Sequence, residues 1–152
     1  MIQKKYLLLL ILCFLISLGF SQNTIPSEKL DHNDWEIDNY LGFDSQKNQY
    51  GIKNNVLIKG STTHFEYKNI GLGKISHVDF QNPLQIIVFY KDFNTVVLLD
   101  NQLNEIKRID FNLNPELIQL EAVGLSAQNQ LWFYDGITNK IGLYNITNDH
   151  LK

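Results

Sequence analysis

The feature that most constrains this chain is a repeat of short, β-like segments. A shift of about 45 residues places residues 78–100 on residues 123–145 without a gap. The shift superimposes several identical residues: Val78 on Val123, Gln85 on Gln130, Asn94 on Asn139 and Leu98 on Leu143. A chain built from copies of one unit buries its apolar faces by stacking neighbouring copies. A repetitive β fold is therefore expected.

Turn-forming Asn, Asp and Gly residues separate the segments, which are about four to seven residues long, as strands are. Aromatic residues make up 12% of the chain and Ala occurs only at Ala122 and Ala127, a composition that favours strands over helices. Strands are expected at 49–53, 56–59, 63–68, 75–80, 85–90, 95–100, 105–110, 121–126, 130–134 and 140–144. Their apolar members form the expected core: Ile52, Leu57, Ile86, Val88, Val96, Leu98, Val123, Leu131, Phe133, Ile141 and Leu143. The predicted fold class is all-β, with antiparallel β-meanders.

The last copy of the repeat resembles a known structural unit. Asp135 ends an aromatic strand, and Asn139, Lys140 and Ile141 follow after a turn. This spacing is similar to that of NHL-type β-propeller blades, and about 45 residues with four strands is the size of a blade. The resemblance covers residues 75–145 and implies a propeller architecture. It implies no catalytic residues, because the repeated motif is structural.

The repeat predicts an incomplete propeller. After a polar segment at 22–40, blades are expected at 41–70, 74–112 and 117–152. Propellers have about four to eight blades, so these units would form an open arc rather than a closed ring. The last unit stops near the point where its fourth strand should begin. This favours a truncated form of a longer chain, and the alternatives are pairing with another copy or an arc with open edges.

The N-terminal residues are typical of a secretory signal peptide. Lys4 and Lys5 form a basic start, residues 6–20 are uncharged and largely apolar, and Ser21 provides a small residue for cleavage. The expected signal peptide is therefore 1–21. The alternative is an uncleaved anchor, which needs about 20 apolar residues and fits this shorter run less well.

Cleavage after Ser21 would remove Cys13, the only Cys of the chain. Leu12 precedes this Cys where a lipoprotein signal has a small residue, so lipidation is not expected. The exported chain would have no disulfide and no stable membrane insertion, and we expect it in the periplasm, at the cell surface or outside the cell. A net charge of −3 provides no broad basic patch, which argues against a nucleic-acid partner.

Two short motifs could supply metal ligands. His64 and Glu66 lie two residues apart, as do His77 and Asp79, so on strands each pair would share one face. Two imidazoles and two carboxylates make an acceptable set for a transition metal. The motifs fall on the outermost strand of one expected blade and the innermost strand of the next, which are not neighbours. We therefore expect solvated polar side chains, with no metal and no cofactor.

The aromatic residues near the C-terminus are the ligand-binding candidates. Trp132, Tyr134 and Tyr144 could form a platform for a sugar or a peptide. Aromatic side chains at alternating strand positions also pack between blades, and the sequence favours this second role.

The sequence favours a non-enzymatic binding or scaffold protein of the cell envelope. It contains no G-x-S-x-G, H-E-x-x-H, phosphate-binding Gly loop or EF-hand spacing. The alternative is a fragment of a propeller hydrolase or lyase whose catalytic residues lie in missing blades. The partner would be an envelope protein, a peptide or a glycan. Self-association is also expected, because the strand at 140–144 would lack its neighbour and expose unpaired backbone groups.

Overall fold

The computed structural model describes Tyr6, residues 35–60 and residues 64–151. The described residues from Trp35 onward belong to one compact unit. The expected signal peptide lies outside the described residues, apart from Tyr6, and so does most of the polar segment that follows it. Within the part of the chain that is described, no helix has both the length and the apolar character needed to cross a membrane.

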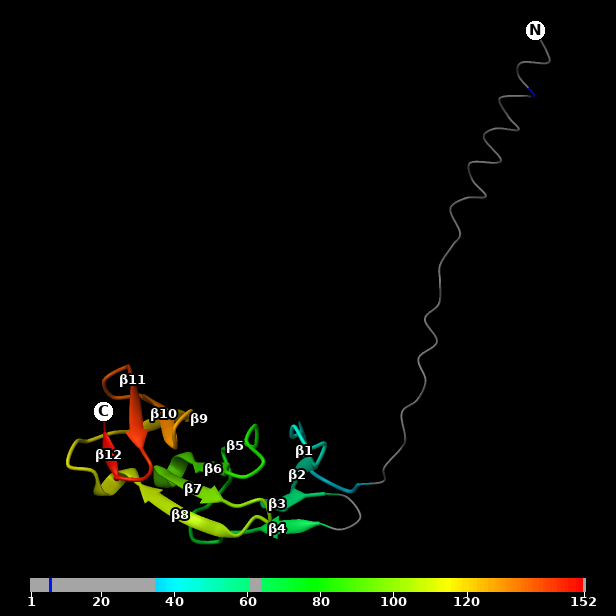
Figure 1. The fold of residues 1–152 in the computed structure, drawn as a ribbon, viewed down its shortest axis with the longest axis horizontal. Coiled ribbons are helices and arrows are strands. Elements are labelled where there is room, and N and C mark those ends of the chain that lie inside the picture. Colours follow the sequence, from blue (N-terminus) through cyan, green and yellow to red (C-terminus); the bar gives the residue numbers. More distant parts are fainter. Residues whose placement is uncertain (1–5, 7–34, 61–63, 152) are drawn as a thin grey trace. The chain divides into compact units, whose positions relative to one another are not determined.

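The described residues form three antiparallel sheets of four strands each, and each sheet is consecutive in the sequence (Figure 1). Sheet 1 consists of β1 (Asn39–Phe43), β2 (Gln49–Lys53), β3 (Val56–Lys59) and β4 (Phe65–Tyr67). Sheet 2 consists of β5 (His77–Asp79), β6 (Ile86–Tyr90), β7 (Thr95–Leu99) and β8 (Glu105–Asp110). Sheet 3 consists of β9 (Leu120–Ser126), β10 (Gln130–Asp135), β11 (Lys140–Asn145) and β12 (His150–Leu151). Two short 3-10 turns, η1 (Lys91–Phe93) and η2 (Phe111–Leu113), follow β6 and β8, and the predicted all-β class is confirmed.

Two strands, β1 and β12, lie outside the predicted set. β1 contains an irregularity between Tyr40 and Gly42, where Gly42 has a φ of 134°, so its side chains do not alternate regularly. β12 pairs with Tyr144 and Asn145 of β11. The edge that was expected to be unpaired is therefore covered over these two residues. Residues 140–143 have no partner strand on that side within the described part of the chain.

Sheet 2 is buried on both faces because it lies between the other two sheets (Figure 1). We call the face of a sheet that is turned toward the next sheet in the sequence its forward face, and the opposite face its backward face. On the backward face of sheet 2, Ile86 and Val88 pack in one core with residues of sheet 1. On the forward face, Ile87 and Phe89 pack in a second core with residues of sheet 3. The continuous apolar run of β6 fills both cores, since successive side chains of a strand point to opposite faces.

The predicted core is largely confirmed. The predicted residues that are buried are Leu57, Ile86, Val88, Val96, Leu98, Val123, Leu131 and Phe133. Ile52 and Leu143 are half-buried. The prediction is wrong for Ile141, which is 73% exposed although the repeat aligns it with the buried Val96. Sheet 3 covers Val96, whereas no described residue covers Ile141 in the same way.

The turn between β2 and β3 ties sheet 1 to sheet 2. Asn55 donates from Nδ2 to the backbone oxygen of Gly73 at 2.7 Å, and its Oδ1 accepts from the backbone N–H of Ile75 at 2.8 Å. Gly73 and Ile75 belong to the segment that leads into β5. The φ of Asn55 is 62°, in the left-handed region that Asn tolerates better than most residues. We call this two-bond contact an Asn bridge.

The turn between β6 and β7 repeats the same arrangement and ties sheet 2 to sheet 3. Asn94 has a φ of 50° and is only 4% exposed. Its Nδ2 donates to the backbone oxygen of Ile118 at 2.7 Å, and its Oδ1 accepts from the N–H of Leu120 at 2.8 Å. Both Asn bridges therefore join backbone groups two residues apart on the segment that enters the next sheet.

Candidate functional site

The forward face of sheet 3 carries the exposed aromatic residues of the C-terminal region. In the strand register, Trp132 lies between Gly124 of β9 and Leu143 of β11. Tyr134 lies in the same way between Ala122 and Ile141. Trp132 is 48% exposed, Tyr134 36% and Ile141 73%. The small residues on β9 leave a shallow hollow of about 180 Å³ beside the two rings, and its accessible lining is apolar.

This face has an occupied counterpart in sheet 2. The repeat places Trp132 on Ile87 and Tyr134 on Phe89. Ile87 is 0% exposed and Phe89 is 2% exposed, because sheet 3 packs on them. The forward face of sheet 3 is thus built like an interface between sheets but is open within the described residues.

Asn139 stands beside this face in the turn between β10 and β11. It has a φ of 56° and occupies the position that Asn94 has in sheet 2. Its Oδ1 accepts a hydrogen bond of 2.8 Å from the hydroxyl of Tyr134. The side chain that would form a further Asn bridge therefore lies next to the aromatic residues of the face.

Tyr144, the remaining aromatic candidate, lies on the opposite face of sheet 3. It is 5% exposed and its ring packs against Phe111 with centroids 5.2 Å apart. Its hydroxyl donates to Asp149 at 2.7 Å. Burial, together with this hydrogen bond, raises the pKa of Tyr144 above its ordinary value. Tyr144 therefore packs in the core between sheets 2 and 3, and the structure does not bring it together with Trp132 and Tyr134.

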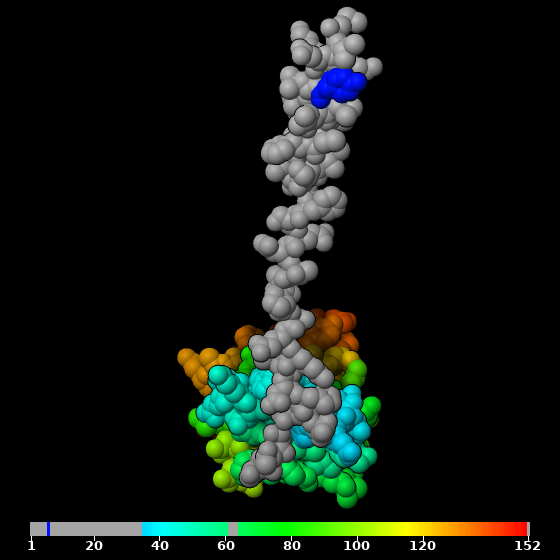
Figure 2. Space-filling model, turned by 90° about the vertical axis from the view of Figure 1, so that its right-hand side faces the viewer, coloured from blue at the N-terminus to red at the C-terminus, as the bar shows by residue number. Residues whose placement is uncertain are grey.

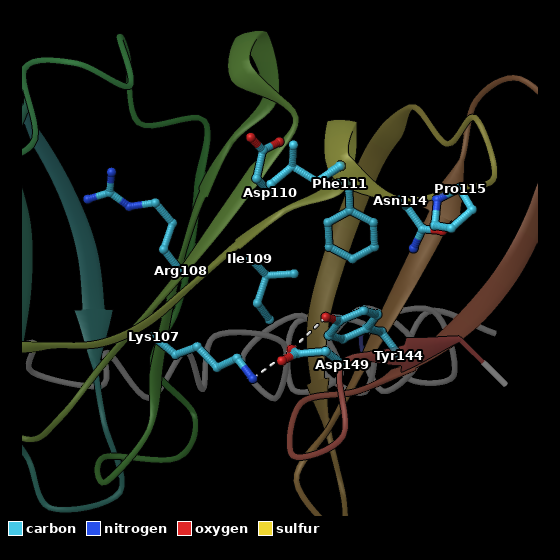
Figure 3. Close-up of a pocket in the computed structure, with 10 residues that line it drawn as sticks. Lys107, Arg108, Ile109, Asp110, Phe111, Asn114, Pro115, Tyr144 and Asp149 are labelled. Carbon is cyan, nitrogen blue, oxygen red and sulfur yellow. Dashed lines mark hydrogen bonds and ion pairs between the residues drawn. The ribbon is translucent and has the colours of Figure 1, made fainter.

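A cavity of about 280 Å³ lies beside Tyr144, between β8 and the C-terminal strands (Figure 3). Lys107 Nζ lies 2.6 Å from Asp149 Oδ1 and also donates to the backbone oxygen of Ile146 at 2.5 Å. The hydrogen bonds from Lys107 and Tyr144 lower the pKa of Asp149. Arg108 points away from these groups in Figure 3 and donates to Glu105. The polar groups around the cavity are bound to one another, which fits a seam between sheets better than a reactive centre.

No protein-family profile matches this sequence, and no curated protein matches it. Among solved structures, the chain is similar to virginiamycin B lyase from Staphylococcus aureus, in a catalytically inactive form with quinupristin, at 13% identity and a TM-score of 0.54. It is also similar to apo AztD from Citrobacter koseri, at 12% identity and a TM-score of 0.54. The matches cover 81% and 87% of this chain but 42% and 39% of those chains, so it spans about two fifths of their length.

The fold is an incomplete β-propeller. Each sheet is one antiparallel, four-stranded blade, as the repeat length predicts. At such low identity the likeness concerns the fold alone, so the function must be inferred from the residues of this chain.

The structure separates the two motifs that were considered as metal ligands. His64 and Glu66 form an exposed contact of 3.0 Å on blade 1. On blade 2, His77 is exposed, while Asp79 accepts a hydrogen bond of 2.9 Å from the N–H of Leu125 on blade 3. Asp79 therefore has a structural contact between blades. Among residues 35–60 and 64–151, no three His, Cys, Asp or Glu side chains are grouped so that they could hold a metal ion.

Sequence reasoning missed the role of the asparagines. Asn94 and Asn139 coincide in the repeat, but Asn is common in turns and its side-chain contacts cannot be predicted from a turn alone. The signal was present in the repeat: each of these residues lies in the turn between the second and third strands of its sheet. In sheet 2 this turn lies beside the segment that enters the next sheet.

Proposed function

We propose that this chain is a non-enzymatic binding or scaffold protein that is exported to the cell envelope and built from NHL-type blades. Its working surface is the forward face of blade 3. The signal-like N-terminus supports export, and the spacing of Asp135 and Asn139 supports the NHL type.

A single observation carries the proposal: an interface-like face is open. Trp132 and Ile141 are 48% and 73% exposed, while the residues aligned with them in blade 2 are buried against the next blade. Exposed apolar clusters of this kind are typical of surfaces that bind a partner. Trp and Tyr are the side chains most often found at the centre of such surfaces, because they bury large apolar areas and keep a polar group at the rim.

The alternative remains a fragment of a propeller hydrolase or lyase, with its catalytic residues in blades outside this sequence. The observations above favour binding, because the open aromatic face of blade 3 consists of side chains that pack rather than react. The three side chains of this face, Trp132, Tyr134 and Ile141, include no Ser, Cys, Lys or His that could act as a nucleophile or base, and no carboxylate.

Photochemical cross-linking in the host tests the proposed binding face. The full chain is made with p-benzoylphenylalanine in place of Trp132, and a control chain carries it in place of Ile106. Ile106 is 58% exposed on β8, away from the forward face of blade 3. Illumination should give a discrete adduct from position 132 and none from position 106. The absence of any adduct at position 132, with the chain present in the envelope, would contradict the proposal.

A further inference from the structure

We propose that the partner on this face is a second copy of the same chain, which docks the backward face of its blade 1 on the forward face of blade 3. The inference rests on the proposed function, because it uses the same binding face. It commits to one occupant, and three observations support it: the chemistry of the Asn bridges, the side chains of blade 1 and the number of blades.

The two Asn bridges define what a docked blade must offer. Asn55 and Asn94 each bind a backbone N–H and the backbone oxygen of the residue two positions earlier. The N–H belongs to Ile75 in blade 2 and to Leu120 in blade 3, and both side chains are buried in the core. A docking segment therefore needs an apolar residue at this position, with its backbone groups available.

Blade 1 carries the same entry segment. The N–H of Asp38 donates to the oxygen of Ile52 at 2.9 Å, and the N–H of Ser76 donates to the oxygen of Phe89 at 2.9 Å. Each bond joins the entry segment of a blade to its second strand. Ile37, which precedes Asp38, is therefore the counterpart of Ile75 in blade 2.

The backbone groups that a bridge would use are unpaired with other backbone groups of the described residues on blade 1. Among residues 35–60 and 64–151, no backbone–backbone hydrogen bond involves the N–H of Ile37 or the oxygen of Trp35. Asn139 has the backbone conformation of the two bridging asparagines, with a φ of 56°. Its Nδ2 would donate to the backbone oxygen of Trp35 of the second copy, and its Oδ1 would accept from the backbone N–H of Ile37 of that copy. The two existing Asn bridges use the same kinds of atoms.

The side chains of blade 1 supply a matching apolar face. In the register of sheet 1, Tyr40 pairs with Gly51 and Phe43 pairs with Gln49, so both aromatic residues lie on the backward face. Tyr40 is 53% exposed and Phe43 is 57% exposed. Figure 2 views the unit from the side of blade 1, whose residues run from cyan to green. The chain thus has one exposed aromatic face on its first blade and another on its last.

The number of blades favours closure by two copies. The described residues of each copy form three sheets, so the described blades of two copies number six, within the range of about four to eight blades found in propellers. Head-to-tail contacts form a closed ring when the rotation between copies permits it and otherwise extend into a filament. We infer a closed pair with two identical contacts.

A mixing experiment tests the pairing. One full-chain variant carries Trp132→Glu and Ile141→Glu on the forward face of blade 3, and the other carries Tyr40→Glu and Phe43→Glu on the backward face of blade 1. These side chains are exposed in the single chain, so each variant should keep its circular dichroism spectrum. The matched control is Ile106→Glu, and the N-terminal region and Cys13 are the same in every protein.

Light scattering under reducing conditions should show pairs for the unaltered chain and for Ile106→Glu. Each double variant alone should be a single chain, because both contacts of its pair would include an altered face. Mixing the two variants restores one intact contact, so mixed pairs should form with a dissociation constant at least about tenfold weaker than that of the unaltered pair. Two differently tagged chains identify the mixed pair.

The inference is overturned if the unaltered chain is single at micromolar concentration, if either double variant still pairs, or if mixing restores nothing. A face-to-face pair would use blade 3 of both copies and would not be restored by mixing. The cross-linking experiment separates this inference from the proposed function. An adduct with residues 35–43 of a second copy supports both, an adduct with another protein supports only the binding function, and no adduct contradicts both.

Discussion

The forward faces of blades 2 and 3 occupy the same place in the repeat but have opposite environments. Ile87 and Phe89 of blade 2 are 0% and 2% exposed, whereas Trp132 and Tyr134 of blade 3 are 48% and 36% exposed. The strands that carry them, β6 and β10, are each the second strand of a four-stranded sheet. Burial in this fold therefore depends on the neighbouring blade and cannot be assigned from the strand alone.

The chemistry of the two faces differs in a way that suits their environments. Ile87 and Phe89 have no polar side-chain atom, so their exposure to water would be unfavourable. Trp132 and Tyr134 combine a large apolar ring with an N–H or O–H group, so they can remain partly hydrated and still bury apolar area when covered. The hydroxyl of Tyr134 already donates to Asn139 at 2.8 Å.

The largest difference between the two faces should be seen when one aromatic ring is removed from each. Phe89→Ala should lower the free energy of unfolding by about 4 kcal/mol, because it leaves a cavity in the core between blades 2 and 3. Tyr134→Ala, at the aligned position, should lower it by only about 0.5 kcal/mol, since Tyr134 is 36% exposed and its removal leaves no enclosed cavity. Urea denaturation of the full chain measures both values.

Both substitutions are made in the Ile141→Glu background, so that docking on the forward face of blade 3 does not contribute. Equal losses for the two variants would contradict the comparison. They would mean that Tyr134 is covered by some part of the chain, or that Phe89 is less important for the core than its burial indicates.

The two asparagines provide the second test of the comparison. Asn94→Gly should lower the free energy of unfolding by about 2 kcal/mol, because the buried backbone groups of Ile118 and Leu120 lose their partner. Asn139→Gly should change it by less than about 0.5 kcal/mol when both variants are made in the Ile141→Glu background, where no second copy docks. Glycine is chosen because both positions have positive φ, so neither substitution introduces backbone strain.

Hydrogen exchange adds a local measurement to this test. The amide of Leu120 should exchange faster in Asn94→Gly, whereas Asn139→Gly should leave it unchanged. A similar loss of stability in both variants would show that Asn139 already has a buried structural role, and the bridge to a second copy would lose its support.

The sequence predicted the strands well because their pattern is local. Apolar runs between turn residues specify β6, β7 and β10, and the repeat relates them to one another. The exposure of Ile141 could not be predicted in this way, because it depends on what lies beyond blade 3. The strand β12 was missed for a different reason: it has only two residues, which pair with Tyr144 and Asn145, and so short a segment shows no strand pattern.

The packing of side chains across neighbouring strands also could not be predicted from the sequence. In blade 2, Val88 pairs with Val97, whereas in blade 3 Phe133 pairs with Gly142. A Cβ on Gly142 would overlap the ring of Phe133, so a large and a small residue replace two residues of middle size. Each change alone looks like a break in the repeat. Together they keep the volume, and only the strand register reveals that they are neighbours.

The smallest expected effect concerns Asp135, which stands where blade 2 has Tyr90. Asp135 is 4% exposed, and it accepts hydrogen bonds from the Thr138 hydroxyl at 2.5 Å and from the N–H of Gln119 at 3.0 Å. The Thr138 hydroxyl is the main cause that lowers the pKa of Asp135 to about 2, and the backbone bonds contribute next. Because the folded pKa lies below the ordinary value of 3.8, ionised Asp135 stabilises the fold above pH 4. That stabilisation is lost as the pH falls from about 4 toward 2.

Thr138→Val removes the hydroxyl with little change of shape and should raise the pKa of Asp135 toward its ordinary value. The variant should lose about 1 kcal/mol of unfolding free energy at pH 7, since one hydrogen bond to a carboxylate disappears. The difference from the unaltered chain should shrink as the pH falls from about 4 toward 2, because protonated Asp135 gains less from the hydroxyl. Urea denaturation at pH 7, 4 and 2.5 measures this, with Thr147→Val as the control: that hydroxyl accepts from Asn129 and not from a titrating group. A loss of equal size at every pH would assign the effect of Thr138 to packing of the turn, and the low pKa of Asp135 would then have to come from the backbone N–H groups alone.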